Sequence, residues 1–434
     1  MFGYYLNLAL RSFRRNRVLT ALMVLAIALG IGASMTTLTV FHVLSGDPIP
    51  QKSDRLFYVQ LDPETRDGYK PGEEPQLQLT RFDAQELLRQ KKAKRQAMMT
   101  GGGGVLEPEG TKLKPFVLSM RYTSADFFPM FEVPFLRGRP WTGTDDEARA
   151  RVAVITRELA EKLFGSADPV GREVRVEGNA LRIVGVLDTW KPTPHFYDLN
   201  TGRYNNDEDV YVPMSTALDL KLGRNGSMDC YGRTVTNDPT AENVPCTWMQ
   251  YWVELASADD APAYKRYLDN YSEQQRSAGR FERPANTRLR NVMEWLEFRQ
   301  VVPGDVRLQL WLAFGFLLVC LLNTVGLLLA KFLRRSSEFG VRRALGASRR
   351  AIFTQCLVEA GTVGLAGGLL GLGLALLGLW GVRQRPAEYA QLAHLDGGML
   401  LLTFALAIGA SLLAGLLPAW RAMRVPPALQ LKSQ

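Results

Sequence analysis

The sequence predicts a membrane protein with four transmembrane helices and one large extracytoplasmic domain of mixed α/β (α+β) structure. Two features of the 434 residues support this fold class. A transmembrane helix needs about 20 mostly apolar residues, and four stretches reach that length: 18–44, 308–332, 355–380 and 399–417. The long stretch 45–307 is polar instead, and it has the strand and helix patterns of a water-soluble domain.

Positive charge is concentrated where the predicted helices leave the membrane. The segments 1–17, 331–354 and 418–434 contain 4, 7 and 3 of the 52 Lys and Arg residues, and Glu338 is the only acid among them. Basic residues gather at the cytoplasmic ends of membrane spans. The formal net charge of +9 therefore indicates membrane edges rather than a nucleic-acid surface.

The same charge rule assigns each segment to a side of the membrane. Segment 1–17, the loop 333–354 and the tail 418–434 are predicted to be cytoplasmic, and the domain 45–307 and the short loop 381–398 periplasmic. Segment 1–17 is amphipathic and basic, which predicts a helix at the membrane surface. The apolar run that follows it is too long for a signal peptide, whose core has about 7–15 residues.

The soluble domain shows alternating strand and helix patterns. β-branched and aromatic residues predict strands at 56–61, 152–156, 181–187, 210–212 and 249–255. Helical patterns occur at 81–90, 158–164, 261–275 and 286–300. The segment 189–246 is rich in Asn, Asp, Gly and Pro, so we expect it to form a long irregular insertion.

Residues that could catalyse a reaction are scarce. The histidines, His42, His195 and His394, are far apart in the sequence, so we expect neither a catalytic metal nor a His-based triad. The run Gly101–Gly104 lacks the Lys-Ser/Thr and the helix start of a phosphate-binding loop, and it predicts a turn or a bulge. We therefore expect a non-catalytic chain that binds no cofactor itself.

The four cysteines fall into two groups. Cys230 and Cys246 lie in the extracytoplasmic stretch, where a disulfide and two free thiols are both possible. Cys320 and Cys356 lie in or beside apolar spans, and we expect them to be packing residues.

Small and polar residues in the spans indicate how the helices pack. Small residues four positions apart let helix backbones approach closely, and two pairs have this spacing: Gly364/Gly368 and Gly367/Gly371. They fit a dimer interface or packing within the chain. Asn323 is expected to hydrogen-bond another helix, and Glu359 to reach the membrane interface. The spans lack the series of acids expected of an ion-coupled carrier.

The loop between the second and third spans has the properties of a short docking helix. Glu338 and Arg342 have the favourable acid-first spacing of four residues, worth about 0.2–0.5 kcal/mol in a helix. A run of mostly small residues follows: Ala344, Leu345, Gly346 and Ala347. Gly346 weakens a helix and would permit a bend or the close approach of a partner. On these residues alone, a docking helix and a simple positively charged anchor remain equally possible.

Several separated motifs resemble one known family. The order Asn323…Glu338-Phe-Gly-Val-Arg-Arg-Ala-Leu-Gly-Ala347…Gln355…Glu359-Ala360 resembles the signature of MacB/FtsX-type ABC transporter permeases of the type VII-like kind. The stretches 122–139, 152–155, 163–165, 169–171 and 183–186 resemble the MacB-type periplasmic domain, and 415–424 with Pro426 and Pro427 resembles the C-terminal end of the family. The resemblance covers nearly the whole chain.

The resemblance implies a domain plan and a coupling site. The periplasmic domain would contain a Porter-like part, 50–115 and 247–300, and a Sabre-like insertion, 116–246. A coupling helix in the cytoplasmic loop would dock on an ABC ATPase, and it would comprise Glu338, Phe339, Gly340, Arg342, Arg343, Ala344, Leu345, Gly346 and Ala347. Some members carry the ATPase ahead of the first span. In this sequence the first span already begins at residue 18, so we expect ATP and Mg²⁺ to bind a separate partner polypeptide.

The resemblance also implies a function. The chain would be the permease subunit of an ABC transporter in the bacterial inner membrane, with both termini cytoplasmic. It would transmit ATP-driven movement to its periplasmic domain (mechanotransmission) for efflux. The expected partners are an ATPase, a second permease subunit (identical or different), a periplasmic adaptor and an outer-membrane channel. The alternatives are a lipoprotein-releasing permease and an FtsX-like scaffold that activates cell-wall hydrolases.

Overall fold

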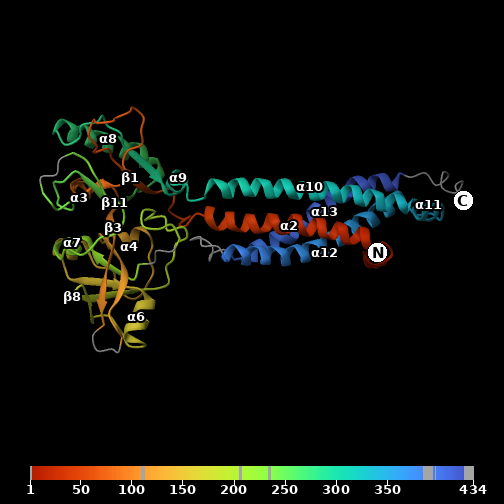
Figure 1. Ribbon diagram of the computed structural model, residues 1–434, viewed down its shortest axis with the longest axis horizontal. Helices are drawn as coiled ribbons and strands as arrows, with labels where there is room; N and C mark the ends of the chain where they lie inside the picture. The colour runs from red at the N-terminus through yellow and green to blue at the C-terminus, as the bar shows by residue number, and fades with distance from the viewer. Residues whose placement is uncertain are drawn as a thin grey trace. The chain divides into compact units, whose positions relative to one another are not determined.

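The computed structural model describes residues 2–108, 113–204, 208–232, 236–384, 394–395 and 397–424. The chain divides into a helical unit, Met1–Ser45 with Val302–Gln434, and a sheet unit, Gly46–Val301 (Figure 1). Most of the predicted loop 381–398, and the tail from residue 425 onward, lie outside the described residues.

Long helices make up the helical unit. They are α1 (Phe2–Arg15), α2 (Arg17–Ser45), α10 (Gly304–Arg334), α12 (Arg349–Arg383) and α13 (Gly397–Met423), with the short α11 (Ser336–Ala344) between α10 and α12. Among the described residues, four helices are long and apolar enough to cross a membrane: α2, α10, α12 and α13. This confirms the predicted number of transmembrane helices. The helix α13 continues through Pro418, so the start of the predicted tail 418–434 is helical.

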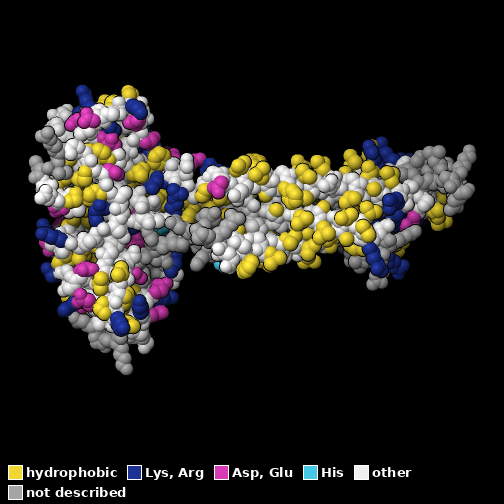
Figure 2. All heavy atoms as spheres, viewed as in Figure 1, with side chains coloured by type: hydrophobic (Ala, Val, Ile, Leu, Met, Phe, Trp, Pro, Cys, Tyr) yellow, Lys and Arg dark blue, Asp and Glu magenta, His cyan; other side chains and the backbone are white. Residues whose placement is uncertain are grey.

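The helical unit has its own apolar core and an apolar outer surface. The helix α2 packs against α10 and α12, and α12 packs against α13. Buried side chains such as Ile27, Ile31 and Val363 fill the contacts. Leu312 and Leu377 are more than 60% exposed on the outer sides, and Figure 2 shows apolar side chains along the visible face of the unit. A surface of this kind suits contact with lipid.

The sheet unit is built from short strands and helices. Its strands are β1 (Leu56–Gln60), β2 (Leu79–Thr80), β3 (Arg95–Glu107), β4 (Phe116–Thr123), β5 (Phe135–Gly138), β6 (Val152–Ile155), β7 (Glu173–Val176), β8 (Asn179–Leu187), β9 (Val210–Pro213), β10 (Asp229–Cys230), β11 (Cys246–Glu254) and β12 (Arg288–Asn291). Its helices are α3 (Arg81–Gln90), α4 (Phe127–Met130), α5 (Gly143–Glu147), α6 (Arg157–Phe164), α7 (Met214–Asp219), α8 (Ala261–Ser277) and α9 (Val292–Phe298), with a 3₁₀ turn at Ala258–Asp260.

The strands form one mixed sheet with an apolar core on each face. Its main order is β12-β1-β11-β3-β4-β9-β6-β8-β5; β2 and β10 pair with β11, and β7 pairs with β3 and β8. Alternate residues of a strand point to opposite faces, so Phe57 and Val59 of β1 belong to one core, and Leu56 and Tyr58 to the other. The first core includes side chains of α3, α6 and α8, and the second those of α4 and α9.

Two predictions about local structure in the sheet unit need correction: the helix at 286–300 is right only in part, and the turn or bulge at Gly101–Gly104 is wrong. The segment 286–300 is a strand followed by a short helix, because Arg288–Asn291 pairs with β1 and Asn291 then caps α9. The run Gly101–Gly104 lies inside β3 rather than in a turn. Side chains there would collide with Tyr122 and Asn225, which lie against the strand. The backbone of Gly101 also accepts a hydrogen bond from Asn225 N at 3.0 Å.

The predicted irregular insertion 189–246 is more ordered than its composition suggests. It contains β9, α7 and β10. In its first part, Asp198 and Glu208 are buried and surround Arg121 of β4. Arg121 donates to Asp198 Oδ2 at 2.5 Å and, through Nε, to Glu208 Oε1 at 3.0 Å. Burial raises the pKa of Glu208, but Arg121 and His195 together hold it well below its usual range. This ion cluster fixes the segment against the sheet.

Candidate functional site

The short helix α11 and its neighbours form the candidate functional site. The helices α10 and α12 flank α11 in the sequence, and α1 and the C-terminal end of α13 lie at the same end of the helical unit (Figure 1). Figure 2 shows Lys and Arg side chains gathered near this end. This is the position of the predicted coupling helix.

The bounds of that helix differ from the predicted 338–347. The helix α11 begins at Ser336 and ends at Ala344, with Leu345 as its C-cap. Gly346 has a φ of +99°, a conformation that favours glycine, and it ends the helix. Gly346 and Ala347 therefore belong to the turn before α12, which Ser348 caps by accepting a hydrogen bond from Ala351 N at 3.1 Å.

The coupling residues divide into an inner and an outer face. Phe339 and Gly340 are buried against the helical unit. Glu338, Arg342, Arg343 and Ala347 are half-buried, and Ala344 and Gly346 are exposed. Val341 and Leu345 are exposed by 51% and 83%. The outer face of α11 thus presents apolar side chains that no described residue of this chain covers.

A buried ion cluster lies beneath α11. Glu359, one per cent exposed, comes from the first part of α12. Its Oε1 lies 2.7 Å from Lys331 Nζ and accepts a hydrogen bond from Ser12 Oγ at 2.5 Å. Its Oε2 lies 2.9 Å from Arg335 Nη1. The expectation that Glu359 reaches the membrane interface is therefore wrong, because two cations and a hydroxyl satisfy it inside the helical unit.

Arg335 connects this cluster to α11. Its Nε and Nη2 donate to the two carboxylate oxygens of Glu338 at 3.1 and 3.0 Å, while its Nη1 contacts Glu359 and donates to Ser12 Oγ at 3.1 Å. Such bidentate, charge-assisted pairs fix geometry as well as contributing energy. One guanidinium thus joins α1, α11 and α12.

Two further contacts attach α11 to the spans. Arg342 lies 3.4 Å from Glu338 and donates to Gln355 Oε1 of α12 at 2.8 Å. Arg343 donates to the backbone oxygen of Met423, in α13, at 3.5 Å. The predicted Glu338–Arg342 pair is present, but its carboxylate is shared with Arg335. Side-chain contacts of Arg335, Arg342 and Arg343 thus attach α11 to α1, α12 and α13.

Lys331, Arg335 and Ser12 were not predicted as site residues. Lys331 is fully buried and also donates to Thr20 Oγ1 of α2 at 3.2 Å. A charged side chain inside a membrane span requires a partner of opposite charge. The acid Glu359, one turn into the third span, could therefore have indicated that cations lie beside it.

The glycines of α12 pack within the chain. A side chain at Gly364 would collide with Ser411 of α13, and a Cβ at Gly368 would lie 2.8 Å from Ala407 Cβ. A Cβ at Gly371 would lie 3.1 Å from Ile31 Cβ of α2. Asn323, by contrast, is exposed on α10. The expected hydrogen bond from Asn323 to another helix does not occur among the residues that the structure describes.

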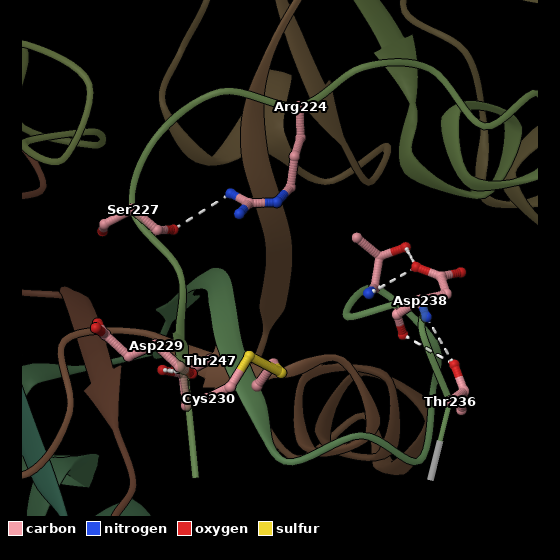
Figure 3. The surroundings of a disulfide bond; sticks show 9 residues. Arg224, Ser227, Asp229, Cys230, Thr236, Asp238 and Thr247 are labelled. Atoms are coloured by element: carbon pink, nitrogen blue, oxygen red, sulfur yellow. Dashed lines mark hydrogen bonds between the residues drawn. A yellow bond between two sulfur atoms is a disulfide. The ribbon is translucent and has the colours of Figure 1, made fainter. Parts of the chain in front are cut away.

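The cysteines and the metal-binding residue types add little chemistry. Cys230 of β10 and Cys246 of β11 form a disulfide that closes the end of the insertion (Figure 3), and Cys320 and Cys356 are buried free thiols. In the same loop, Arg224 donates to the backbone oxygen of Ser227 (Figure 3). Across the described residues, no three His, Cys, Asp or Glu side chains are grouped so that they could hold a metal ion.

Comparisons with known proteins agree with this layout. Residues 20–271 match the MacB-like periplasmic core domain family, and residues 310–427 match the FtsX-like permease C-terminal family. The macrolide export ATP-binding/permease protein MacB of Rhodospirillum rubrum is 26% identical over 443 residues, which cover 100% of this chain and 61% of that protein. The pyoverdine export ATP-binding/permease protein PvdT of Pseudomonas aeruginosa is 24% identical over 426 residues, which cover 96% of this chain and 57% of that protein.

The chain thus spans about three fifths of the length of these two relatives. Among solved structures, the periplasmic region of MacB from Actinobacillus actinomycetemcomitans matches with a TM-score of 0.37 and 14% identity. That match covers 59% of this chain and 96% of the other.

Proposed function

Because this chain belongs to the family of MacB-like ABC transporter permeases, we propose that it transmits movement from an ABC ATPase to its periplasmic domain. In this proposal the ATPase is a separate polypeptide that binds ATP and Mg²⁺, and it docks on α11. The chain and its ATPase then act together in export across the bacterial cell envelope. The chain lies in the inner membrane, with both termini in the cytoplasm.

The observation that carries the proposal is the two-sided construction of α11. Its outer face exposes Val341 and Leu345, and its inner face is tied by Arg335 and Arg342 to the long helices. An exposed apolar face of this kind suits docking into a protein groove. The ionic contacts behind it would pass a push on α11 to α12 and α1, since buried charge pairs hold one arrangement.

Charge supports the orientation. The segment 331–354 contains seven basic residues and a single acid, Glu338; the basic residues are Lys331, Arg334, Arg335, Arg342, Arg343, Arg349 and Arg350. Short loops rich in Lys and Arg stay in the cytoplasm. The sheet unit would then be periplasmic, with residues 50–115 and 247–300 as the Porter-like part and 116–246 as the Sabre-like part.

We further propose that two permease subunits act together and engage a periplasmic adaptor and an outer-membrane channel. The similarity to macrolide export and pyoverdine export ATP-binding/permease proteins supports an export role. Asn323 and the exposed leucines of α10 are a surface on which a second subunit could pack.

The docking role can be tested with single substitutions on the outer face of α11. The full chain would be affinity-purified from native membranes, with co-purified ATP-binding proteins identified by mass spectrometry and ATP hydrolysis measured in the eluate. Val341→Asp and Leu345→Asp should each remove the ATPase without unfolding the chain, because both side chains are exposed. Val117→Asp is the matched control, since Val117 is 77% exposed in the sheet unit. Retention of the ATPase by both α11 variants would refute the docking role.

A further inference from the structure

The sheet unit contains a cavity that the coupling mechanism does not use. Its volume is about 650 Å³, within the range of about 300–1,000 Å³ that is usual for small-molecule sites. The end of α3, the start of β3, the loop after β4, and the helices α5 and α7 form its wall. The cavity thus lies where elements from distant parts of the sequence meet.

One deeply buried polar group in this wall lacks a partner. Gln96 is only 3% exposed, and its Nε2 donates to the backbone oxygens of Leu87 and Leu88 at 3.2 and 3.1 Å. Its Oε1 accepts no hydrogen bond from any residue in the described part of the chain. Ser215 Oγ, in the same wall, is likewise buried without a described partner. Buried polar atoms normally have partners, so this wall is suited to a ligand with N–H donors.

The carboxylates of the wall are not balanced by cations. Asp126, Asp146 and Glu147 line the cavity, and none forms an ion pair within the described chain. In the described part of the chain, the carboxylate of Asp126 accepts a hydrogen bond from Gln96 N alone, at 3.0 Å. Asp146 accepts from Ala125 N at 2.7 Å and Trp141 Nε1 at 3.0 Å.

The basic residues of the wall do not neutralise these acids. Arg89 pairs with Glu86 at 2.6 Å, and Lys94 pairs with Glu254 at 3.0 Å. Both acids lie outside the cavity wall. Lys91 remains, and it is exposed at the end of α3. Asp126 and Glu147 therefore outnumber Lys91, and Asp146, whose pKa burial raises to about 7, adds its negative charge only above that pH.

We propose that this cavity binds an organic cation through a primary ammonium or guanidinium group placed between Asp126 and Asp146. The same group, or a neighbouring N–H, supplies the donor that Gln96 lacks. The apolar body of the ligand packs on Leu88, Met98 and Met214, which also line the cavity. A charged group bound in this way forms charge-assisted hydrogen bonds, which are about twice as strong as neutral ones.

The proposal rests on neither α11 nor the ATPase, so it is tested by binding alone. The full chain in lipid nanodiscs would be titrated with 2-phenylethylamine and followed by saturation-transfer NMR, with empty nanodiscs subtracted. Two probes of nearly the same shape, 2-phenylethanol and 3-phenylpropanoate, serve as the neutral and anionic comparisons. We expect saturable binding of the amine, weaker binding of the alcohol and no binding of the carboxylate.

Variants locate the site. At pH 8, where Asp146 is ionised, Asp146→Asn should weaken amine binding about tenfold, the effect of about 1.4 kcal/mol. Asp146 also accepts two internal hydrogen bonds, which Asp146→Asn alters, so a second variant is needed. Glu147→Gln serves this purpose: Glu147 is exposed, so the change leaves the fold intact. It should also weaken amine binding. Ser215→Phe should occupy part of the cavity and weaken amine binding. Glu161→Gln on α6 removes the same charge elsewhere on the sheet unit and should not change amine binding.

Three outcomes would each overturn the proposal: equal binding of the three probes, absence of saturable amine binding, or unchanged amine binding in Glu147→Gln and Ser215→Phe.

Discussion

Lys331 and Glu359 form a buried ion pair that joins α10 to α12, with 2.7 Å between Nζ and Oε1. Neither residue is more than 1% exposed. The carboxylate is also shared with Arg335, so the cluster has two cations for one buried acid. The two partners should therefore respond differently to substitution.

We predict that Glu359→Gln destabilises the helical unit more than Lys331→Met. The first change leaves two cations buried without their shared carboxylate, and breaking a buried pair in this way costs about 3–5 kcal/mol. The second leaves Glu359 paired with Arg335, so its cost should be nearer about 1–2 kcal/mol. Thermal unfolding of the purified chain in detergent measures both. An equal or reversed order of the two unfolding temperatures would contradict the role of the shared carboxylate.

The ion cluster of the sheet unit predicts a large effect at Arg121. Arg121→Met leaves Asp198 and Glu208 buried without their cation, which should lower the free energy of unfolding by about 3–5 kcal/mol. The matched control is Arg149→Met, because Arg149 pairs with Asp219 at the same short range, 3.0 Å, but with both side chains exposed. Exposed pairs contribute about 0–1 kcal/mol. Similar effects of the two substitutions on thermal unfolding would show that the Arg121 cluster does not fix the insertion.

Asp146 predicts a pH dependence of stability. Burial, and then the charges of Asp126 and Asp145, raise the pKa of Asp146 from 3.8 to about 7. Between these pH values the folded chain keeps a proton that the unfolded chain has lost, so stability falls as pH rises through this window and is then constant. Relative to Asp146→Asn, which has no such proton, the free energy of unfolding of the wild-type chain should fall by about 2–4 kcal/mol from pH 4 to pH 7. Unfolding temperatures of both proteins across this range measure the difference. If the stability of the wild type relative to Asp146→Asn stays constant or rises with pH, the assignment is contradicted.

The glycines of α12 predict a position-specific packing effect. Gly368→Leu should separate α12 from α13, because even a Cβ at this position would lie 2.8 Å from Ala407 Cβ, and overpacking costs about 1–3 kcal/mol or more. Gly373→Leu on the same helix is the control, since no heavy atom lies within 4 Å of its Cβ position. Only the first variant should lose monodispersity in gel filtration and unfold at a lower temperature. If both variants lose monodispersity and unfold at a lower temperature, α12 does not pack specifically through the face that contains Gly368.

The spans could be predicted from the sequence because apolar length is a local property, which the four long helices confirm. Long-range contacts could not. The sequence places Glu359 one turn into a span, but only the fold brings Lys331, Arg335 and Ser12 around it. Likewise, Gly101–Gly104 resembles a turn until Tyr122 and Asn225 are seen to lie against it. The segment 286–300 was misassigned because its pairing with β1 overrides its helical pattern.

In the proposed coupling role, movement received by α11 reaches the far ends of the spans through Arg335. Spin labels at Leu308→Cys in α10 and Trp380→Cys in α12 would report it, because both side chains are exposed. The natural cysteines interfere little, since Cys320 and Cys356 are buried and Cys230 and Cys246 are bonded to each other. The label-to-label distance would be measured by pulsed electron paramagnetic resonance on the complex with its ATPase, with and without trapped ATP.

ATP should shift this distance in the otherwise unaltered chain. In Arg335→Leu the ATPase should remain bound, because Val341 and Leu345 are untouched, but the shift should be lost. A distance that does not respond to ATP in the unaltered chain, or that responds equally in Arg335→Leu, would contradict the account.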